Sequence, residues 1–448
     1  MTMDQIVAYC NHYGYIFQGS EIYGGLANTW DYGPLGARLK NNIKDAWRRA
    51  FVETRDNSFE LDAAILMNPM VWKASGHLDG FTDPLLDCKN CKARHRADSL
   101  IAGFDPAARP DAMTLPEMLA FLREKGVPCP RCGKRDFTDI RTFNLMFSTK
   151  RGVTEESADT VYLRPENAQG EYVNYLNLAR VGRCAPPFGV GQVGKAFRNE
   201  ITPGNFTFRT IEFEQMEYQM FVKPGTDGAY YEELKEYAMD FFVSLGLPRE
   251  KLRFHDHEKL AHYAKAACDI EYLFPFGWGE INGTHNRGDF DLSRHQAFSG
   301  KSMEARDEAT GEKYIPRIVE STCGADRLAL ALLCEGLAED GERLLLRLAP
   351  RLAPVKVTVL PLNKNRHGAR ARALYEEMRR IIPASYDEAG NIGRRYRRGD
   401  AAGTPFAVTV DDETLEKNTV TLRDRDTMAQ ETIRADALPG RLRAAVSP

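Results

Sequence analysis

The sequence predicts a two-domain protein: an α+β body built on antiparallel strands, carrying a cysteine-containing insertion, and a smaller C-terminal α/β domain. The chain has 448 residues, more than one hydrophobic core usually serves. Two strand-like runs joined by a turn-rich loop lie near the middle of the chain, which favours an antiparallel pair. Beyond the proline-interrupted stretch 348–354, strands and helices alternate, as is typical of an α/β domain. We therefore expect the body at 1–348 and the C-terminal domain at 349–448.

Composition and charge exclude several classes of protein. Hydrophobic residues make up 43% and charged residues 27%, so disordered, collagen-like and coiled-coil chains are excluded. No run approaches the roughly 18 apolar residues of a membrane span, and the first residues lack the pattern of a signal peptide. We expect a soluble, cytoplasmic chain that does not contact membranes. Basic residues outnumber acidic ones from Arg351 onward, which hints at a polyanionic partner but equally suits a solvated surface.

The first strong helix signal lies at residues 34–52. Pro34 suits a first helical position, and apolar residues recur every four positions from Leu35 to Phe51. A strand-like run follows at 59–66 and stops near Pro69.

The nine cysteines favour a metal site over disulfides. An odd count without a signal peptide argues against a disulfide framework. Four of the cysteines form two Cys-x-x-Cys pairs, Cys88/Cys91 and Cys129/Cys132, whose spacing suits a tetrahedral structural zinc ion. Reduced thiols without metal are the alternative, and a redox role is disfavoured because neither pair sits at a strand–helix junction. The surrounding stretch, about 84–140, resembles an insertion with one short helix at 115–125.

Residues 191–200 and 209–221 read as two antiparallel strands joined by a loop at 202–207. Helices are expected at 230–245 and 259–268, then a Gly/Asp-rich stretch at 276–291, and then a helix from Gly324 through Leu333. In the C-terminal domain we expect strands at 355–360, 384–386, 406–410 and 419–423, with helices at 370–381 and 392–398.

One face of the second strand carries unusual chemistry. Side chains alternate with period two, so Arg209, Ile211, Phe213, Gln215, Glu217 and Gln219 share a face, and Arg198 shares a face with Glu200 on the first strand. Arg198 could bind a phosphate, Phe213 could stack on a base and Glu217 could hold an ammonium group. A solvated polar face with cross-strand ion pairs explains any single one of these residues. The joint pattern, with Arg327 at a helix start downstream, favours a binding site.

These segments resemble three motifs of class II aminoacyl-tRNA synthetases. Phe197-Arg-Asn-Glu200 followed by Arg209-Thr-Ile-Glu-Phe213 resembles motif 2, and Gly324-Ala-Asp-Arg327 resembles motif 3. The helix from Leu35, the strand after it and Pro69 resemble motif 1, which forms the dimer interface in that family. The strings beginning at Arg164, Phe208 and Gly277 are similar to those of homodimeric glycyl-tRNA synthetases, and the C-terminal domain is similar to their anticodon-binding module.

The resemblance implies a substrate, a reaction and a set of ATP contacts. It implies that glycine, ATP and tRNA(Gly) are the substrates of a homodimer, that Mg²⁺ assists, and that glycyl-adenylate is the intermediate. Arg198 and Arg327 would be catalytic, Arg198 on the α-phosphate and Arg327 on the far phosphate. Phe213 would stack on adenine, Glu200 would accept from its amino group, and Glu280 would bind Mg²⁺. The remaining ATP contacts implied are Asn199, Phe208, Arg209, Ile281, Gly324 and Asp326.

For glycine, the resemblance implies that Glu166, Glu217 and Glu320 face the ammonium group, while Arg96, Gln215 and Thr322 complete the pocket. Thr322 and the string Glu320-Ser-Thr-Cys323 depart from the family pattern, in which a serine and a motif 3 glycine are usual. Steric exclusion at Cα makes a separate editing domain unnecessary, and no segment is left over for one.

Two alternatives keep the fold and change the function. Prolyl-, threonyl- and histidyl-type enzymes share the architecture, but the acidic pocket and the absence of an editing segment count against threonine and proline. Catalytically silent accessory subunits with this fold would be expected to lose the motif arginines, whereas this chain keeps Arg198 and Arg327. In the C-terminal domain, Arg394-Arg-Tyr-Arg-Arg398 would lie near RNA phosphates with Tyr396 free to stack, or else form a solvated helix face.

Overall fold

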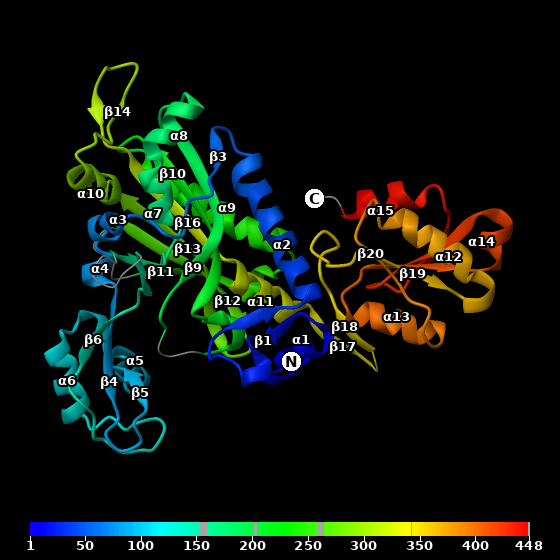
Figure 1. Ribbon diagram of the computed structural model, residues 1–448, viewed down its shortest axis with the longest axis horizontal. Coiled ribbons are helices and arrows are strands. Elements are labelled where there is room, and N and C mark those ends of the chain that lie inside the picture. The colour runs from blue at the N-terminus through cyan, green and yellow to red at the C-terminus, as the bar shows by residue number, and fades with distance from the viewer. Residues whose placement is uncertain (153–158, 201–203, 258–263, 342, 447–448) are drawn as a thin grey trace.

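A seven-stranded sheet forms the centre of the protein (Figure 1). The computed structural model describes residues 1–152, 159–200, 204–257, 264–341 and 343–446. In spatial order the sheet contains β11 (Leu252–Asp256), β12 (Ala266–Phe274), β13 (Gly277–Gly288), β16 (Arg317–Gly324), β10 (Glu212–Val222), β9 (Phe188–Phe197) and β3 (Ser58–Glu60). Every neighbouring pair is antiparallel except β3 and β9, which are parallel.

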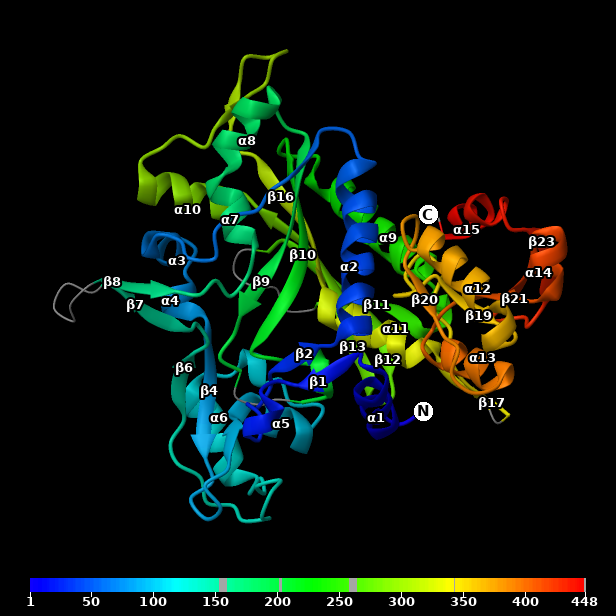
Figure 2. The ribbon, with the colours of Figure 1, turned by 45° about the vertical axis from the view of Figure 1, so that its right-hand side comes forward.

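Helices cover one face of this sheet with a large apolar core. They are α1 (Met3–Tyr13), α2 (Pro34–Arg48), α9 (Asp227–Ser244) and α11 (Ala325–Gly336) (Figure 2). Met216, Tyr218 and Met220 project from β10 into this core, which also takes in Ile43 and Trp47 of α2. Alternation then directs the odd-numbered side chains of β10 to the other face, where the polar residues lie.

Shorter elements surround this centre. The helices are α3 (Pro69–Ala74), α4 (His77–Gly80), α7 (Ala168–Val173), α8 (Tyr175–Gly182) and α10 (Phe290–Ser299), with short helical turns at Glu21–Tyr23, Arg49–Glu53, Pro110–Ala112, Phe206–Phe208 and Arg249–Lys251. Among the described residues of the body there are also four two-stranded ribbons, formed by β1 (Ile16–Gln18) with β2 (Trp30–Tyr32), β7 (Ser148–Arg151) with β8 (Asp159–Tyr162), β14 (Ala305–Arg306) with β15 (Lys313–Tyr314), and β17 (Leu337–Asp340) with β18 (Arg343–Leu346).

Residues Thr82–Asn144, the cysteine segment, project from the body with a sheet and a core of their own (Figure 1). The segment contains β4 (Thr82–Asp87), β5 (Arg94–Arg96), α5 (Ala97–Phe104), α6 (Leu115–Glu124) and β6 (Arg141–Asn144). Its sheet order is β5-β4-β6, so β4 and β6 pair side by side where the segment leaves and rejoins the body.

The C-terminal residues form a second sheet with a second core (Figure 2). The strand order is β20 (Ala384–Tyr386), β19 (Val357–Pro361), β21 (Phe406–Val410), β22 (Thr419–Asp424) and β23 (Gln430–Arg434). The helices are α12 (Lys364–Met378), α13 (Ile392–Ala401), α14 (Asp412–Lys417) and α15 (Leu438–Val446). The pairs β20/β19 and β19/β21 are parallel, as expected for β-α-β units.

Buried polar contacts join the two cores. Asp400 of α13 accepts hydrogen bonds from Arg423 at 2.8 and 2.9 Å and from Arg343 of β18 at 3.1 Å. The Tyr9 hydroxyl donates to the carbonyl of Ala401 at 2.7 Å. Breaking these contacts would leave buried charges and hydroxyls without partners, so the joint is specific rather than a loose tether.

Several sequence-predicted boundaries are wrong. The strand expected at 191–200 ends at Phe197, because Arg198 to Glu200 leave the sheet, and the strand expected from Arg209 begins at Glu212. The strand in the run 59–66 ends at Glu60, and beyond it an isolated bridge from Leu66 to Leu163 is formed. Residues 276–291 contain the twelve-residue strand β13, whose four glycines hid its alternation. Ala266–Cys268, expected to be helical, belong to β12, and residues 259–263 of that expected helix lie outside the described residues.

Other elements agree with the sequence. The antiparallel β9–β10 pair, helix α2, the short helix α6 and helix α11 occupy the expected places. Strands β20 and β21 have the expected bounds. Within the described part of the chain, no helix has the length and apolar character that crossing a bilayer requires.

Candidate functional site

A cavity of about 240 Å³ opens on the polar face of the central sheet. It is lined by Glu166, Arg198, Glu200, Thr207, Phe208, Arg209, Thr210, Phe213, Glu214, Gln215, Glu217, Glu280, Gly283, His285, Arg287, Glu320, Thr322, Gly324, Asp326 and Arg327. The central strands β10, β16 and β13 form the floor of the cavity, so the register of these strands determines which side chains meet there.

Two rows of side chains cross these strands. Glu217 of β10 lies opposite Thr322 of β16, which lies opposite Gly283 of β13. In the next row, Gln219 lies opposite Glu320, which lies opposite His285. A Cβ atom at Gly283 would lie 2.9 Å from the His285 ring, so a larger residue there would displace the histidine.

Glu320 is fully occupied by hydrogen bonds. His285 Nδ1 lies 2.8 Å from Oε1, while Oε2 receives bonds from Gln219 Nε2 at 2.9 Å, the Tyr172 hydroxyl at 3.1 Å and Arg287 Nη1 at 3.1 Å. Burial works against ionisation, but the Arg287 guanidinium and His285 outweigh it and lower the pKa of Glu320 to about 2. Glu320 therefore stays ionised and has little capacity left for another donor.

Glu166 is also partnered. Its Oε1 accepts from Gln169 Nε2 at 3.1 Å, and its Oε2 lies 3.5 Å from His77 Nε2. Burial opposes the charge, yet His77 and Arg287 hold the pKa of this carboxyl well below its usual range.

Glu217 differs from both neighbours because one of its oxygens has no partner. Its Oε1 accepts only a long bond, 3.4 Å, from the backbone amide of Asn167, and Oε2 has no protein hydrogen bond although the residue is 2% exposed. Burial and the nearby charges of Glu320 and Glu166 raise its pKa well above the usual value for glutamate. A buried acceptor of this kind is costly until a donor arrives.

Other buried oxygens around the cavity share this condition. Gln215 Oε1, Thr322 Oγ1 and Glu200 Oε2 line the same cavity and have no hydrogen-bond partner within the protein. Glu217, Gln215 and Thr322 therefore present oxygens that no protein donor satisfies, whereas Glu200 Oε2 lies 3.8 Å from Arg209 Nη1. The arrangement suits a ligand rich in N–H groups, above all a cationic amine.

Positive charge and aromatic rings occupy another part of the cavity. The Arg198 guanidinium lies 5.4 Å from the centroid of the Phe213 ring and 5.5 Å from that of Phe81, and its Nε donates to the Pro165 carbonyl at 3.1 Å. These contacts fix the arginine and leave other guanidinium donors for an anion. An arginine beside a flat ring can bind a phosphate next to a base.

Arg327 forms a second cationic position at the start of α11. Its Nε donates to the Phe208 carbonyl at 3.0 Å, its guanidinium lies 4.4 Å from the Phe208 ring centroid, and its Nη1 lies 2.9 Å from Glu280 Oε2. Although desolvation opposes ionisation, this guanidinium holds the pKa of Glu280 below its usual value. Glu280 is therefore an ionised carboxylate beside the cavity, of the kind Mg²⁺ prefers.

The cavity contains most of the residues that the sequence singled out, but not all. The backbone N–H of Asn199 donates to the Leu145 carbonyl, and the Ile281 side chain is buried in the apolar core. Arg96 forms ion pairs with Asp83 and Asp98 in the cysteine segment. None of these three is among the lining residues. Their predicted substrate contacts remain predictions. Asp326 lines the cavity but is paired with Lys40 at 2.6 Å.

Sequence reasoning missed the residues that support the carboxylates. Tyr172, His77, His285 and Arg287 hold Glu166 or Glu320, and Glu171 lies buried nearby with both carboxylate oxygens lacking a protein partner. The available signal was the alternation of Gly283, His285 and Arg287, which places all three on one face of β13.

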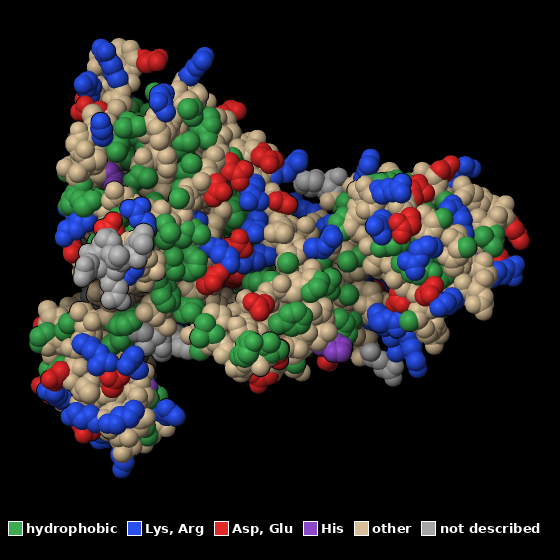
Figure 3. Space-filling view, in the orientation of Figure 1, with side chains coloured by type: hydrophobic (Ala, Val, Ile, Leu, Met, Phe, Trp, Pro, Cys, Tyr) green, Lys and Arg blue, Asp and Glu red, His purple; other side chains and the backbone are tan. Residues whose placement is uncertain are grey.

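The arginine-rich stretch of the C-terminal unit is partly structural. Arg395 is buried and donates to the carbonyls of Pro361 and Gly390. The Tyr396 hydroxyl lies 2.5 Å from Thr409 Oγ1, and the Arg423 guanidinium lies 4.8 Å from its ring centroid. These contacts hold Tyr396 within the unit, and its stacking on RNA stays a prediction. Lys and Arg side chains are nevertheless numerous on the visible surface of this unit (Figure 3).

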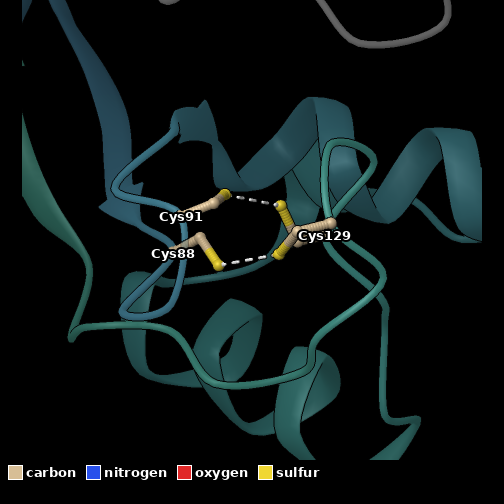
Figure 4. A group of neighbouring side chains, drawn as sticks. Cys88, Cys91 and Cys129 are labelled. Carbon is tan, nitrogen blue, oxygen red and sulfur yellow. Dashed lines mark hydrogen bonds between the residues drawn. The ribbon is translucent and has the colours of Figure 1, made fainter.

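The four paired cysteines come together in the cysteine segment. Cys88, Cys91, Cys129 and Cys132 each offer a sulfur atom within 4.8 Å of the others. All are free thiols, and the sulfurs of Cys88 and Cys91 face the second Cys-x-x-Cys turn, which carries Cys129 (Figure 4). The site could hold a metal ion, but it is separate from the cavity.

Comparison with known proteins identifies the family. Residues 356–445 match the anticodon binding domain family. The chain is 53% identical to the glycine--tRNA ligase of Caldanaerobacter subterraneus subsp. tengcongensis, covering 97% of this chain and 96% of the relative. It is 50% identical to that of Clostridium acetobutylicum, covering 98% and 97%, and 52% identical to that of Geobacillus thermodenitrificans, covering 96% and 94%. This chain belongs to the glycine--tRNA ligase family.

Proposed function

We propose that this chain attaches glycine to its tRNA in an ATP-dependent reaction that passes through glycyl-adenylate. The observation that carries the proposal is one cavity combining two arginines beside aromatic rings with a buried carboxylate oxygen that lacks a donor. A charging assay with labelled glycine, ATP and tRNA tests it. Labelled tRNA is the expected product, and no labelling by folded protein would contradict the proposal.

In the first step the glycine carboxylate attacks the α-phosphorus of ATP. A bond forms between that carboxylate oxygen and phosphorus, the bond to the bridging oxygen breaks, and pyrophosphate leaves. No protein nucleophile is needed, so the contribution of the protein is position and charge. Arg198 stabilises charge on the α-phosphate and Arg327 holds the far phosphate.

Neighbouring groups place the nucleotide. Phe213 offers a ring face for adenine, and Glu200 Oε2, which has no hydrogen bond within the protein, accepts from the adenine amino group. Mg²⁺, which would neutralise charge between phosphates, would be held by Glu280, whose carboxylate chemistry fits the ion.

The three acidic residues Glu166, Glu217 and Glu320 have different roles in recognising glycine. Since Glu320 and Glu166 already accept bonds from protein donors, Glu217 is the carboxylate that receives the ammonium group. Gln215 Oε1 and Thr322 Oγ1 provide further acceptors. In this proposal, steric exclusion next to Cα rejects alanine by overpacking.

Glycine binding should weaken as the pH falls. Because Glu217 has a raised pKa in the free site, it must lose a proton when it accepts an ammonium group. The KM for glycine should therefore rise with falling pH, approaching about tenfold per unit below the pKa of the free carboxyl, while the KM for ATP changes less. Initial rates of pyrophosphate exchange measured against pH test this. A glycine KM that is flat or falls with acidification would contradict it.

The C-terminal domain binds the anticodon arm of tRNA in this proposal, supported by the match to the anticodon binding domain family. The double charge reversal Arg394→Glu with Arg397→Glu places two acidic residues on α13 and should raise the KM for tRNA roughly tenfold or more, since phosphate contacts dominate RNA affinity. Pyrophosphate exchange, which needs no tRNA, should stay unchanged. The opposite pattern, loss of exchange with normal tRNA affinity, would contradict this assignment.

The proposal also includes a class II catalytic domain at 1–348, an anticodon-binding domain at 349–448, a cytoplasmic location and a homodimer. The antiparallel run β11-β12-β13-β16-β10-β9 supports the class II assignment. Sedimentation analysis tests the homodimer, for which twice the chain mass is expected.

A further inference from the structure

The four cysteine sulfurs lie within 4.8 Å of one another, and two pairs of them lie at the spacing of a tetrahedral thiolate site. Cys88 Sγ is 3.6 Å from Cys132 Sγ, and Cys91 Sγ is 3.7 Å from Cys129 Sγ. Sulfurs at the corners of a tetrahedron around zinc, each about 2.3 Å from the metal, are about 3.8 Å apart. A disulfide would bring two sulfurs to about 2.05 Å. The observed distances therefore match a metal-binding arrangement.

The two Cys-x-x-Cys turns have the same backbone geometry. The amide of Lys92 donates to the Cys88 carbonyl at 2.9 Å, and the amide of Gly133 donates to the Cys129 carbonyl at 2.8 Å. Lys92 and Gly133 occupy equivalent positions and both adopt positive φ, +57° and +71°. His95 adds a contact, with Nε2 lying 3.3 Å from Cys129 Sγ. Two matched turns that present thiols to one point form a built site.

The cysteine segment has a small apolar core for its length. Its buried residues are Leu86, Cys88, Ala97, Leu100, Ile101, Met118, Leu122, Val127, Cys129 and Phe137. Two of these ten are the cysteines themselves. Units of this size commonly need a metal or cross-links to hold one structure.

The base of the cysteine segment contacts the Arg198–Glu200 turn at the cavity. Thr82 at the start of β4 pairs with Asn144 at the end of β6, so Phe81 and Leu145 flank the two junctions with the body. The Leu145 carbonyl accepts the amide of Asn199 at 2.8 Å, and the Leu145 amide donates to the Phe81 carbonyl at 3.0 Å. The Phe81 ring lies under the Arg198 guanidinium, 5.5 Å away.

A second connection runs through β5, which directly follows the first cysteine turn. Arg96 Nη1 lies 3.1 Å from Asp83 Oδ1 on β4, and Arg96 also binds Asp98 through two nitrogens. Arg96 and Asp83 both interact electrostatically with Glu200. Displacement of β5 relative to β4 would therefore change the electrostatic field that Arg96 and Asp83 produce at Glu200.

We propose that Cys88, Cys91, Cys129 and Cys132 bind one Zn²⁺, and that this ion makes the cysteine segment a rigid support that positions Arg198, Asn199 and Glu200. Phe81, Arg96 and Leu145 are positioning residues in this arrangement, since they act through the turn they hold. The coupling to catalysis rests on the proposed function, whereas the metal site does not.

Metal analysis of the purified full chain tests the first half. About one zinc per chain is expected, and replacement by Co²⁺ should give the intense visible bands of tetrahedral cobalt thiolate. Cys91→Ser and Cys132→Ser remove half-exposed ligands and should lose the metal. Cys184→Ser, a half-buried cysteine outside the cluster, is the matched control and should keep it. Zinc-free protein as purified, with no cobalt spectrum on reconstitution, would overturn the site.

Two measurements on the zinc-depleted variants test the support. Hydrogen exchange at the Asn199 and Leu145 amides should accelerate, and the kcat of pyrophosphate exchange should fall roughly tenfold or more while Cys184→Ser stays normal. If these amides are equally protected in the metal-free variants and in the wild type, the proposed rigid support is wrong, even if the wild-type chain binds zinc. If the wild-type chain gives no exchange with glycine, the proposed function fails, and the metal and amide measurements still decide this inference.

Discussion

Replacement of Arg198 by alanine should reduce glycine-dependent exchange of pyrophosphate into ATP by about a hundredfold to a thousandfold, mainly through kcat. The guanidinium is oriented by Pro165, Phe81 and Phe213, so in the proposed mechanism it would meet the α-phosphate already positioned. Charge on that phosphate grows as the glycine carboxylate attacks. A contact that strengthens along the reaction lowers the barrier more than it lowers the ground state.

Lys195→Ala is the matched control for this variant. Lys195 lies on β9 three residues before Arg198, but it forms a surface ion pair with Glu212 and does not line the cavity. Its loss should leave exchange within about twofold, because exposed ion pairs contribute little. Near-normal exchange in Arg198→Ala, or an equal loss in both variants, would remove Arg198 from the phosphate site.

Glu217→Gln should raise the KM for glycine roughly tenfold to a hundredfold and leave the KM for ATP nearly unchanged. The substitution keeps the shape of the side chain and removes the charge that pairs with the ammonium group. A charge-assisted bond contributes about 1.5–3 kcal/mol, which sets this range. The neutral side chain should also abolish the rise in glycine KM at low pH.

Glu212→Gln provides the same chemical change on the same strand. Glu212 is half-exposed and does not line the cavity, so the Glu212→Gln variant should bind glycine as the wild type does. If Glu217→Gln bound glycine normally, or if both glutamine variants weakened glycine binding equally, Glu217 would not be the ammonium acceptor. The neighbouring carboxylates would then need to release one of their protein donors to take that role.

The sequence predicted the elements whose patterns are local. Alternation along the expected strand 209–221 placed Phe213, Gln215 and Glu217 on one face, and the structure puts all three at the cavity. Helix α11 follows from its apolar run after Gly324, and β21 from a short continuous apolar stretch. Such signals need no knowledge of distant partners.

Features that depend on strand register could not be predicted from local sequence patterns. Glu320 meets His285 and Gln219 only because three strands align, and no local pattern gives that alignment. Strand β13 was hidden by glycines that lie under other side chains, such as Gly279 beneath Phe208. Tyr396 shows the same limit, because its ring packs with Arg423, which comes from a separate strand.

The most direct test of the account is pyrophosphate exchange into ATP by the wild-type chain, measured separately with each of the twenty amino acids and no tRNA. The account predicts exchange with glycine alone, with alanine at background, because it assigns steric exclusion at Cα and an ammonium acceptor at Glu217. Exchange that is stronger with another amino acid, or absent with glycine, would contradict it.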